Sequence, residues 1–157
     1  NGRQKVFEEI SGTVAAEVAK LIVVHGGIFV LPDAPEEYLK KDDLFDAIRN
    51  MPAHFDSFKV LDGEIGEYIT VARGSGEDWF IGSLTNREAR TIGINFDFLD
   101  ENKSYKATFY EDVADTHYND NKEAYKVKSD VIIDAASTIS VKLAPGGGNA
   151  IWIREVK

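Results

Sequence analysis

The sequence lacks cysteine entirely, and proline, methionine and histidine are scarce among its 157 residues. Without cysteine, the chain forms no disulfide bond, no thiolate metal site and no cysteine nucleophile. Long hydrophobic runs are missing too, because Lys20, His25 and the pair Gly26-Gly27 interrupt the most apolar stretch, residues 18–30. A membrane-spanning helix needs about 20 consecutive apolar residues, so we expect no membrane partner.

Basic residues are outnumbered, with 18 Lys and Arg against 27 Asp and Glu and a formal net charge of −9. Such an excess of negative charge repels a phosphate backbone unless the basic side chains gather on one face. The lysines are instead distributed among carboxylates along the chain. We therefore expect no nucleic-acid partner.

The only imidazoles for catalysis or metal binding belong to His25, His54 and His117. They lie in three separate segments without metal-ligand spacing, and we interpret them as a helix-end, a linker and a loop residue. The 27 carboxylates make chance pairs unavoidable, so sequence proximity alone identifies no acid/base pair. The sequence therefore predicts no catalytic residue in this chain.

An acidic loop between two expected strands is an alternative site for a metal ion. Its oxygen-bearing side chains are Asp112, Asp115, Asn119, Asp120 and Asn121. Carboxylate and amide oxygens are the ligands that calcium prefers, but their spacing here matches no EF-hand loop. A solvated acidic loop is the simpler interpretation, so we predict no metal ligand.

Residues 1–52 show a helical period followed by a short apolar run. Apolar residues between Ser11 and Val24 recur at helical spacing, which predicts a helix that ends at Gly26-Gly27. Residues 28–31 have the pattern of a strand buried on both faces, and residues 36–51 that of an amphipathic helix ended by Pro52. One such α-β-α unit cannot close its own sheet, so further units are expected elsewhere.

After residue 52 the apolar period changes to two, which is typical of β-strands. Polar turns rich in Gly, Asn and Asp separate these segments. Strands are expected over residues 66–73, 78–85, 89–98, 104–111, 123–133, 137–143 and 149–156, with residues 58–61 as a candidate eighth. Short, regularly spaced strands predict a mainly β fold, an antiparallel β-sandwich of Greek-key type, over residues 53–157.

Trp79 and Trp152 are suited to stacking on sugar rings if they share an exposed sheet face. Both lie within apolar strand patterns, so packing in the core is the favoured interpretation. The run Gly146-Gly147-Gly148 lacks the spacing of a phosphate-binding loop and precedes strand-like residues. It predicts a hairpin or the start of a strand.

Five segments carry a family resemblance. They are residues 31–35 (LPDAP) with Tyr38, residues 60–68 (VLDGEIGEY), 79–86 (WFIGSLTN), 105–112 (YKATFYED) and 143–150 (LAPGGGNA). In this order they resemble the C-terminal region of glycoside hydrolase family 97. One segment departs from the family pattern, since residues 25–29 (HGGIF) stand where a sequence similar to ESPLQ is expected.

The resemblance implies that residues 1–52 form the final α-β-α portion of a (β/α)8 catalytic barrel and residues 53–157 a β-sandwich behind it. Family members are calcium-dependent α-glucosidases and α-galactosidases, typically periplasmic or secreted. Their catalytic and calcium-binding carboxylates lie on earlier barrel strands, so none is carried over to this chain. Asp33, after the expected last barrel strand, is the candidate for a sugar subsite of the intact enzyme, although a turn residue is the simpler interpretation.

We therefore expect a non-catalytic accessory and oligomerisation domain of a family 97 hydrolase. Its partners would be the upstream catalytic barrel of the same polypeptide, a second copy in a homodimer and, in the intact enzyme, an oligosaccharide. The alternative is a carbohydrate-binding β-sandwich module with two aromatic side chains on one exposed face. A small hydrolase would need two carboxylates about 5 to 10 Å apart in one cleft. Because the sequence does not begin with Met, we expect it to continue upstream.

Overall fold

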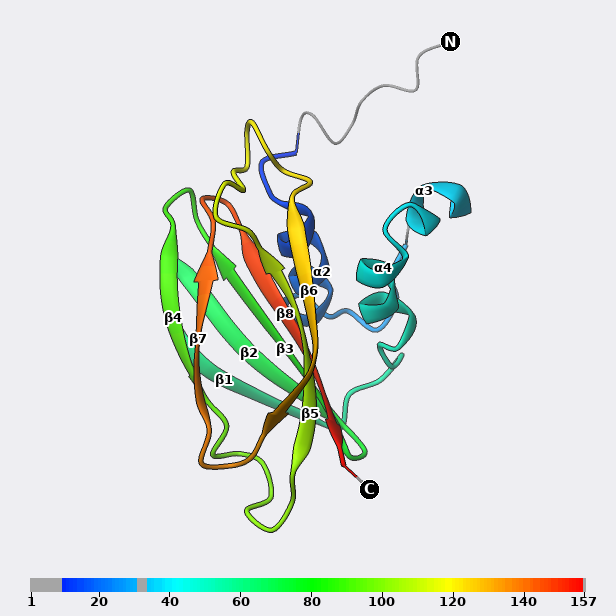
Figure 1. The fold of residues 1–157 in the computed structure, drawn as a ribbon, viewed down its shortest axis with the longest axis vertical. Helices are drawn as coiled ribbons and strands as arrows, with labels where there is room; N and C mark the ends of the chain where they lie inside the picture. Colours follow the sequence, from blue (N-terminus) through cyan, green and yellow to red (C-terminus); the bar gives the residue numbers. More distant parts are fainter. Residues whose placement is uncertain (1–9, 31–33, 157) are drawn as a thin grey trace.

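The computed structural model describes residues 10–30 and 34–156. The described helices are α2 (Val14–Val23), α3 (Pro35–Leu39) and α4 (Asp42–Arg49). The strands that follow are β1 (Ser57–Glu64), β2 (Tyr68–Ser75), β3 (Asp78–Thr85), β4 (Arg90–Asn95), β5 (Tyr105–Asp112), β6 (Tyr125–Ile133), β7 (Thr138–Leu143) and β8 (Gly148–Glu155). Figure 1 shows the strands in two layers, with the helices on the outer side of the larger sheet.

The strands form two antiparallel sheets. The larger sheet has the order β1-β2-β3-β8-β5-β6, and β4 pairs with β7 in the smaller one. Because β8 lies between β3 and β5 while β4 and β7 cross to the second sheet, the connections are of the Greek-key kind. The predicted antiparallel β-sandwich is confirmed, and the candidate eighth strand at residues 58–61 is part of β1.

Alternating apolar side chains fill the space between the two sheets, as the period of two predicts. Each fully buried aliphatic or aromatic side chain contributes about 1.5 to 3 kcal/mol, so this layer is a main source of stability. The buried members of this inter-sheet core are Ala72, Ile81, Ile92, Ile94, Phe96, Leu99, Tyr105, Ala107, Phe109, Ile133, Val141, Leu143, Ile151 and Ile153.

Helix α2 packs on the opposite face of the larger sheet, across β3 and β8. Its N-terminus is capped by Thr13, whose Oγ1 accepts a hydrogen bond from the Ala16 backbone N–H at 3.1 Å. The helix approaches the sheet closely because both strands carry glycine beneath it. A Cβ on Gly82 would lie 2.8 Å from the Ala19 carbonyl oxygen, and one on Gly148 would lie 2.7 Å from the Ala16 Cα.

Arg73 on β2 closes the C-terminal end of α2. Its Nε–H donates to the Ile22 carbonyl oxygen at 2.6 Å, and its Nη2 donates to that of Val23 at 3.3 Å. The last carbonyls of a helix have no partner within the helix, and a cation suits the negative end of the helix dipole. One arginine therefore joins the end of α2 to the strand beside it.

The expected strand over residues 28–31 is not formed in its described part, residues 28–30. Ile28 and Val30 are 85% and 82% exposed. A strand buried on both faces needs neighbouring strands, and no described strand pairs with this segment. The prediction of a buried strand is therefore wrong for residues 28–30 of this structure, and Leu31 lies outside the described residues.

The single helix expected over residues 36–51 is instead two helices, α3 and α4, separated at Lys40-Lys41. Asp42 and Asp43 occupy the first turn of α4, where negative charge favours a new N-terminus. Leu44 and Ala47 are buried from α4 and join α2 in a second core on the outer face of the larger sheet. Within the described chain, no helix is long and apolar enough to cross a membrane.

Candidate functional site

The predicted site residue Asp33 lies outside the described residues, and its role as a sugar contact stays a prediction. The histidines have separate surroundings. His25 contacts the rings of Phe29 and Phe55 at centroid distances of 5.1 and 4.6 Å, consistent with its interpretation as a helix-end residue. His54 is exposed, and His117 Nδ1 accepts a hydrogen bond from the backbone of a neighbouring loop residue.

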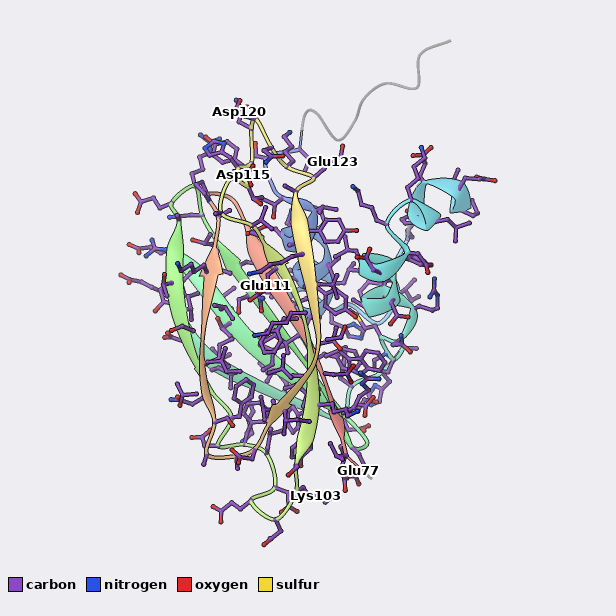
Figure 2. All side chains as sticks on the ribbon, in the orientation of Figure 1. Glu77, Lys103, Glu111, Asp115, Asp120 and Glu123 are labelled. Atoms are coloured by element: carbon purple, nitrogen blue, oxygen red, sulfur yellow. The ribbon has the colours of Figure 1, made fainter. Side chains whose placement is uncertain are left out.

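The acidic loop between β5 and β6 does not bring its carboxylates to one point. Figure 2 shows Asp115 and Asp120 at the tip of the loop, where both are exposed. Asp120 accepts a hydrogen bond from the Asn119 side chain at 2.9 Å, whereas Asp112 is buried. Among the described residues, no three His, Asp or Glu side chains form a group that could hold a metal ion.

Asp112, considered above as a possible metal ligand, instead holds the turn before β8 in place. Its Oδ2 accepts hydrogen bonds from the backbone N–H groups of Ala144 and Gly148, each at 3.0 Å. Burial raises the pKa of this carboxyl, while the Thr13 side chain and the two backbone donors oppose that rise. The carboxylate thereby fixes the glycine-rich turn before β8, and the Gly146 carbonyl of that turn accepts from the Thr13 backbone N–H at 3.2 Å.

A groove lies at the open side of the sandwich, between the β4-β7 sheet and strands β5 and β6. Glu111 and Asp112 both line it, together with Lys126, Lys128 and Lys142. Glu111 pairs with Lys126 at 3.1 Å, and Asp112 is held by backbone donors. Both carboxylates therefore have protein partners that hold the strands and the turn at this groove.

The two tryptophans do not form a common sugar-binding platform. Trp79 packs against the inter-sheet core, with its ring 4.8 Å from that of Phe98. Trp152 lies on the other face of the sheet, stacked at 6.2 Å on Phe80 and covered by the Arg154 guanidinium at 4.2 Å. Both are half-buried. The two tryptophans therefore do not share an exposed face, which a sugar platform built from them would need.

Besides Ile132 and Val156, the exposed large apolar side chains of the described residues fall into two groups along the chain that the sequence pattern did not identify. The first, the linker patch, consists of Val24, Ile28, Val30 and Leu39. The second, the β1 strip, consists of Phe58, Val60 and Ile65 on β1 and its hairpin with β2. Clustered exposed apolar side chains are typical of contact surfaces. Only pairing order reveals that β1 is an edge strand, because alternation alone does not give a strand's place in its sheet.

Comparison with known proteins places the chain in a family. The family model described as "Glycosyl-hydrolase 97 C-terminal, oligomerisation" matches residues 54–154. A retaining alpha-galactosidase of Bacteroides thetaiotaomicron is 35% identical over 146 residues, which cover 91% of this chain and 21% of that protein. The chain thus spans about a fifth of this relative's length.

Solved structures similar to this chain include members of the same family. A glycoside hydrolase family 97 enzyme from Pseudoalteromonas sp. strain K8, solved in complexes with panose and with acarbose, superposes with a TM-score of 0.90 at 31% identity. The match covers 94% of this chain and 23% of that one. A beta-arabinopyranosidase with a TM-score of 0.71 and 18% identity shares the fold. The chain therefore belongs to glycoside hydrolase family 97, whose C-terminal oligomerisation domain it carries.

Proposed function

We propose that this chain is the accessory C-terminal region of an enzyme that hydrolyses terminal α-glycosidic bonds. The observation that carries the proposal is the family match over residues 54–154, within a chain that spans only a fifth to a quarter of its relatives. The relatives are a retaining alpha-galactosidase and an enzyme that binds panose and acarbose. These names support an α-glycosidase of the α-galactosidase or α-glucosidase type.

The chain's own contribution is to support the catalytic part and to hold copies of the enzyme together. The linker patch, with Ile28 and Val30 more than four-fifths exposed, is the surface that the rest of the polypeptide would cover. Covering exposed apolar side chains gains about 25 cal/mol per Å². Neither of the two cores that hold the β-sandwich, to which the oligomerisation description applies, includes a residue of that patch.

Calcium and a periplasmic or secreted location remain predictions of the family resemblance. Among the described residues no group of three carboxylates or imidazoles could hold a metal ion, and the resemblance assigns the calcium ligands to the upstream catalytic barrel.

The test compares the whole protein that carries this chain with the 157-residue chain alone. Both are assayed with nitrophenyl α-galactoside and nitrophenyl α-glucoside, and both are sized by sedimentation velocity. We expect hydrolysis by the whole protein only, and self-association by both. Hydrolysis by the chain alone would overturn the accessory role, and a whole protein inactive on both substrates would overturn the α-glycosidase assignment.

A further inference from the structure

The β1 strip is the main exposed apolar surface within the residues that match the oligomerisation domain. Between residues 54 and 154 the exposed large apolar side chains are Phe58, Val60, Ile65 and Ile132. Three of these four lie on β1 or its hairpin, at one edge of the larger sheet (Figure 1). The linker patch precedes residue 54 and lies outside the matched range.

Phe58 and Val60 point to the same side of the sheet. Val60 is opposite Val71 in the β1-β2 register, and Val71 belongs to the core beneath α2. Helix α2 lies over β3 and β8 and leaves this face of β1 uncovered. The uncovered face continues into a shallow groove lined by Val60, Ile65, Ile69 and Leu84. An apolar surface therefore runs along the edge of the sheet.

The opposite edge, strand β6, is built to resist pairing. Its exposed positions include Lys126, Lys128 and Asp130, and Asp130 has a positive φ of 57° that interrupts the regular strand. Charges and irregular backbone on an edge are the means by which sheets avoid pairing with other chains. The two edges thus differ, and β1 is the one that favours contact.

The charges on β1 favour a second copy as the partner. Lys59 lies at one end of the strand, and Asp62 and Glu64 lie at the other. When two β1 strands run antiparallel about a two-fold axis, the basic end of each strand meets the acidic end of the other. This local complementarity counters the repulsion between two chains that each carry a net charge of −9.

We propose that β1 forms the two-fold contact between two copies of this chain. The strands lie antiparallel, Phe58 and Val60 pack against the partner, and Lys59 faces the partner's acidic end. This inference rests on the proposed oligomerisation function and gives it a location. The occupant is a second copy of this chain, and the catalytic part of the same polypeptide is the outcome that would replace it.

The experiment is sedimentation velocity of the 157-residue chain over a range of concentrations. Val60→Lys places a charge in the β1 strip, and Ile132→Lys is the matched control because the two side chains are 59% and 62% exposed on opposite edges. We expect Val60→Lys to raise the dimer dissociation constant by at least about tenfold, and Ile132→Lys to change it by less than about twofold. Circular dichroism checks that both variants fold, as expected for exposed positions.

A charge exchange separates a second copy from any other partner. Lys59→Glu is expected to weaken the dimer about threefold to tenfold, and adding Glu64→Lys to it is expected to restore most of the affinity. Rescue requires the two ends of β1 to meet across the interface. Failure of the rescue would overturn the antiparallel arrangement.

The remaining outcomes each contradict a different statement. A dimer that Val60→Lys leaves unchanged would overturn the β1 contact while leaving oligomerisation intact. A monomeric chain would overturn the self-association of this region. If the whole protein kept its oligomeric state with Val60→Lys but unfolded at a lower temperature, the β1 strip would be covered by the catalytic part instead.

Discussion

Helices α2 and α4 lie on the same side of the larger sheet but are held there in different ways. Helix α2 sits directly on Gly82 and Gly148. Backbone N–H groups at its start donate to the carbonyl oxygens of Gly146 and Lys122, and its last carbonyls accept from Arg73. Helix α4 buries only Leu44 and Ala47. The comparison teaches that adjacent helices of the N-terminal stretch differ in structural role, since α2 is part of the sandwich and α4 covers it.

The polar contacts between the α4 segment and the sandwich are at the exposed start of the helix. The Tyr125 hydroxyl donates to Asp43 at 2.6 Å, and Lys41 pairs with Glu123 at 3.0 Å. Exposed polar contacts of this kind contribute about 0 to 1 kcal/mol each. We therefore expect substitutions under α2 to affect global stability, and those at α4 to affect local opening.

The largest effect is expected for Gly82→Ala. The added methyl group would lie 2.8 Å from the Ala19 carbonyl oxygen, and a backbone atom within a helix cannot move aside without moving the helix. We expect the free energy of unfolding in urea to fall by about 1 to 3 kcal/mol. Gly93→Ala is the control, because no atom lies within 4 Å of its Cβ position on β4. Equal effects at both glycines would show that α2 is not tightly packed.

An intermediate effect is expected at Asp112, which fixes the turn that bonds to the start of α2. Asp112→Ala leaves the buried N–H groups of Ala144 and Gly148 without their acceptor. Because the change also relieves the cost of burying the carboxyl, we expect a loss of about 1 kcal/mol at neutral pH. The exposed Asp115 provides the control, since Asp115→Ala should leave the urea midpoint unchanged. A similar small effect at both aspartates would contradict the anchoring role.

The pH dependence of the Asp112 contribution follows from its raised pKa. Burial keeps this carboxyl protonated in the folded state at pH values where the unfolded chain, with a carboxyl pKa of about 3.9, has lost the proton. Stability relative to the uncharged Asp112→Asn variant should therefore fall as pH rises above about 4, until the folded carboxyl is ionised. Urea titrations of both proteins between pH 3 and 7 measure this difference, and a rising difference would contradict it.

The smallest effect is expected for Tyr125→Phe, which removes the hydroxyl donor to Asp43 at the start of α4. The global free energy of unfolding should change by less than about 1 kcal/mol because the hydrogen bond is exposed. Cleavage by trypsin between α3 and α4, at Lys40 and Lys41, should become faster. Tyr118→Phe, in the β5-β6 loop, is expected to leave that rate unchanged. A large loss of global stability would remove the distinction between α2 and α4.

Much of the β-sandwich could be predicted from the sequence, because a period of two is a local property of the chain. Residues 78–85, for example, were expected as a strand and form β3 with the same bounds. The strand predicted at residues 28–31 shows the limit of local pattern. The sequence of an apolar run does not show whether neighbouring strands will pair with it. Among the described residues, no strand pairs with residues 28–30.

The surfaces and anchors were less predictable. Asp112 belonged to an acidic loop by sequence, yet it turns inward because backbone donors from residues 144 and 148 meet it there. Likewise, alternation placed Trp79 and Trp152 in strands, while the register between β3 and β8 puts them on opposite faces. Contacts between residues far apart in sequence decide such outcomes, and a local pattern does not contain them.

By itself, the sequence determined the mainly β fold and the helical period of α2, and its motifs carried the resemblance to family 97. Each of these depends on residue types at short spacing. The tertiary structure alone decided that α2 packs on Gly82 and Gly148, that Asp112 serves the turn before β8, and that β1 is an exposed edge. These features arise where distant segments meet, because packing and strand order depend on which surfaces the whole chain brings together.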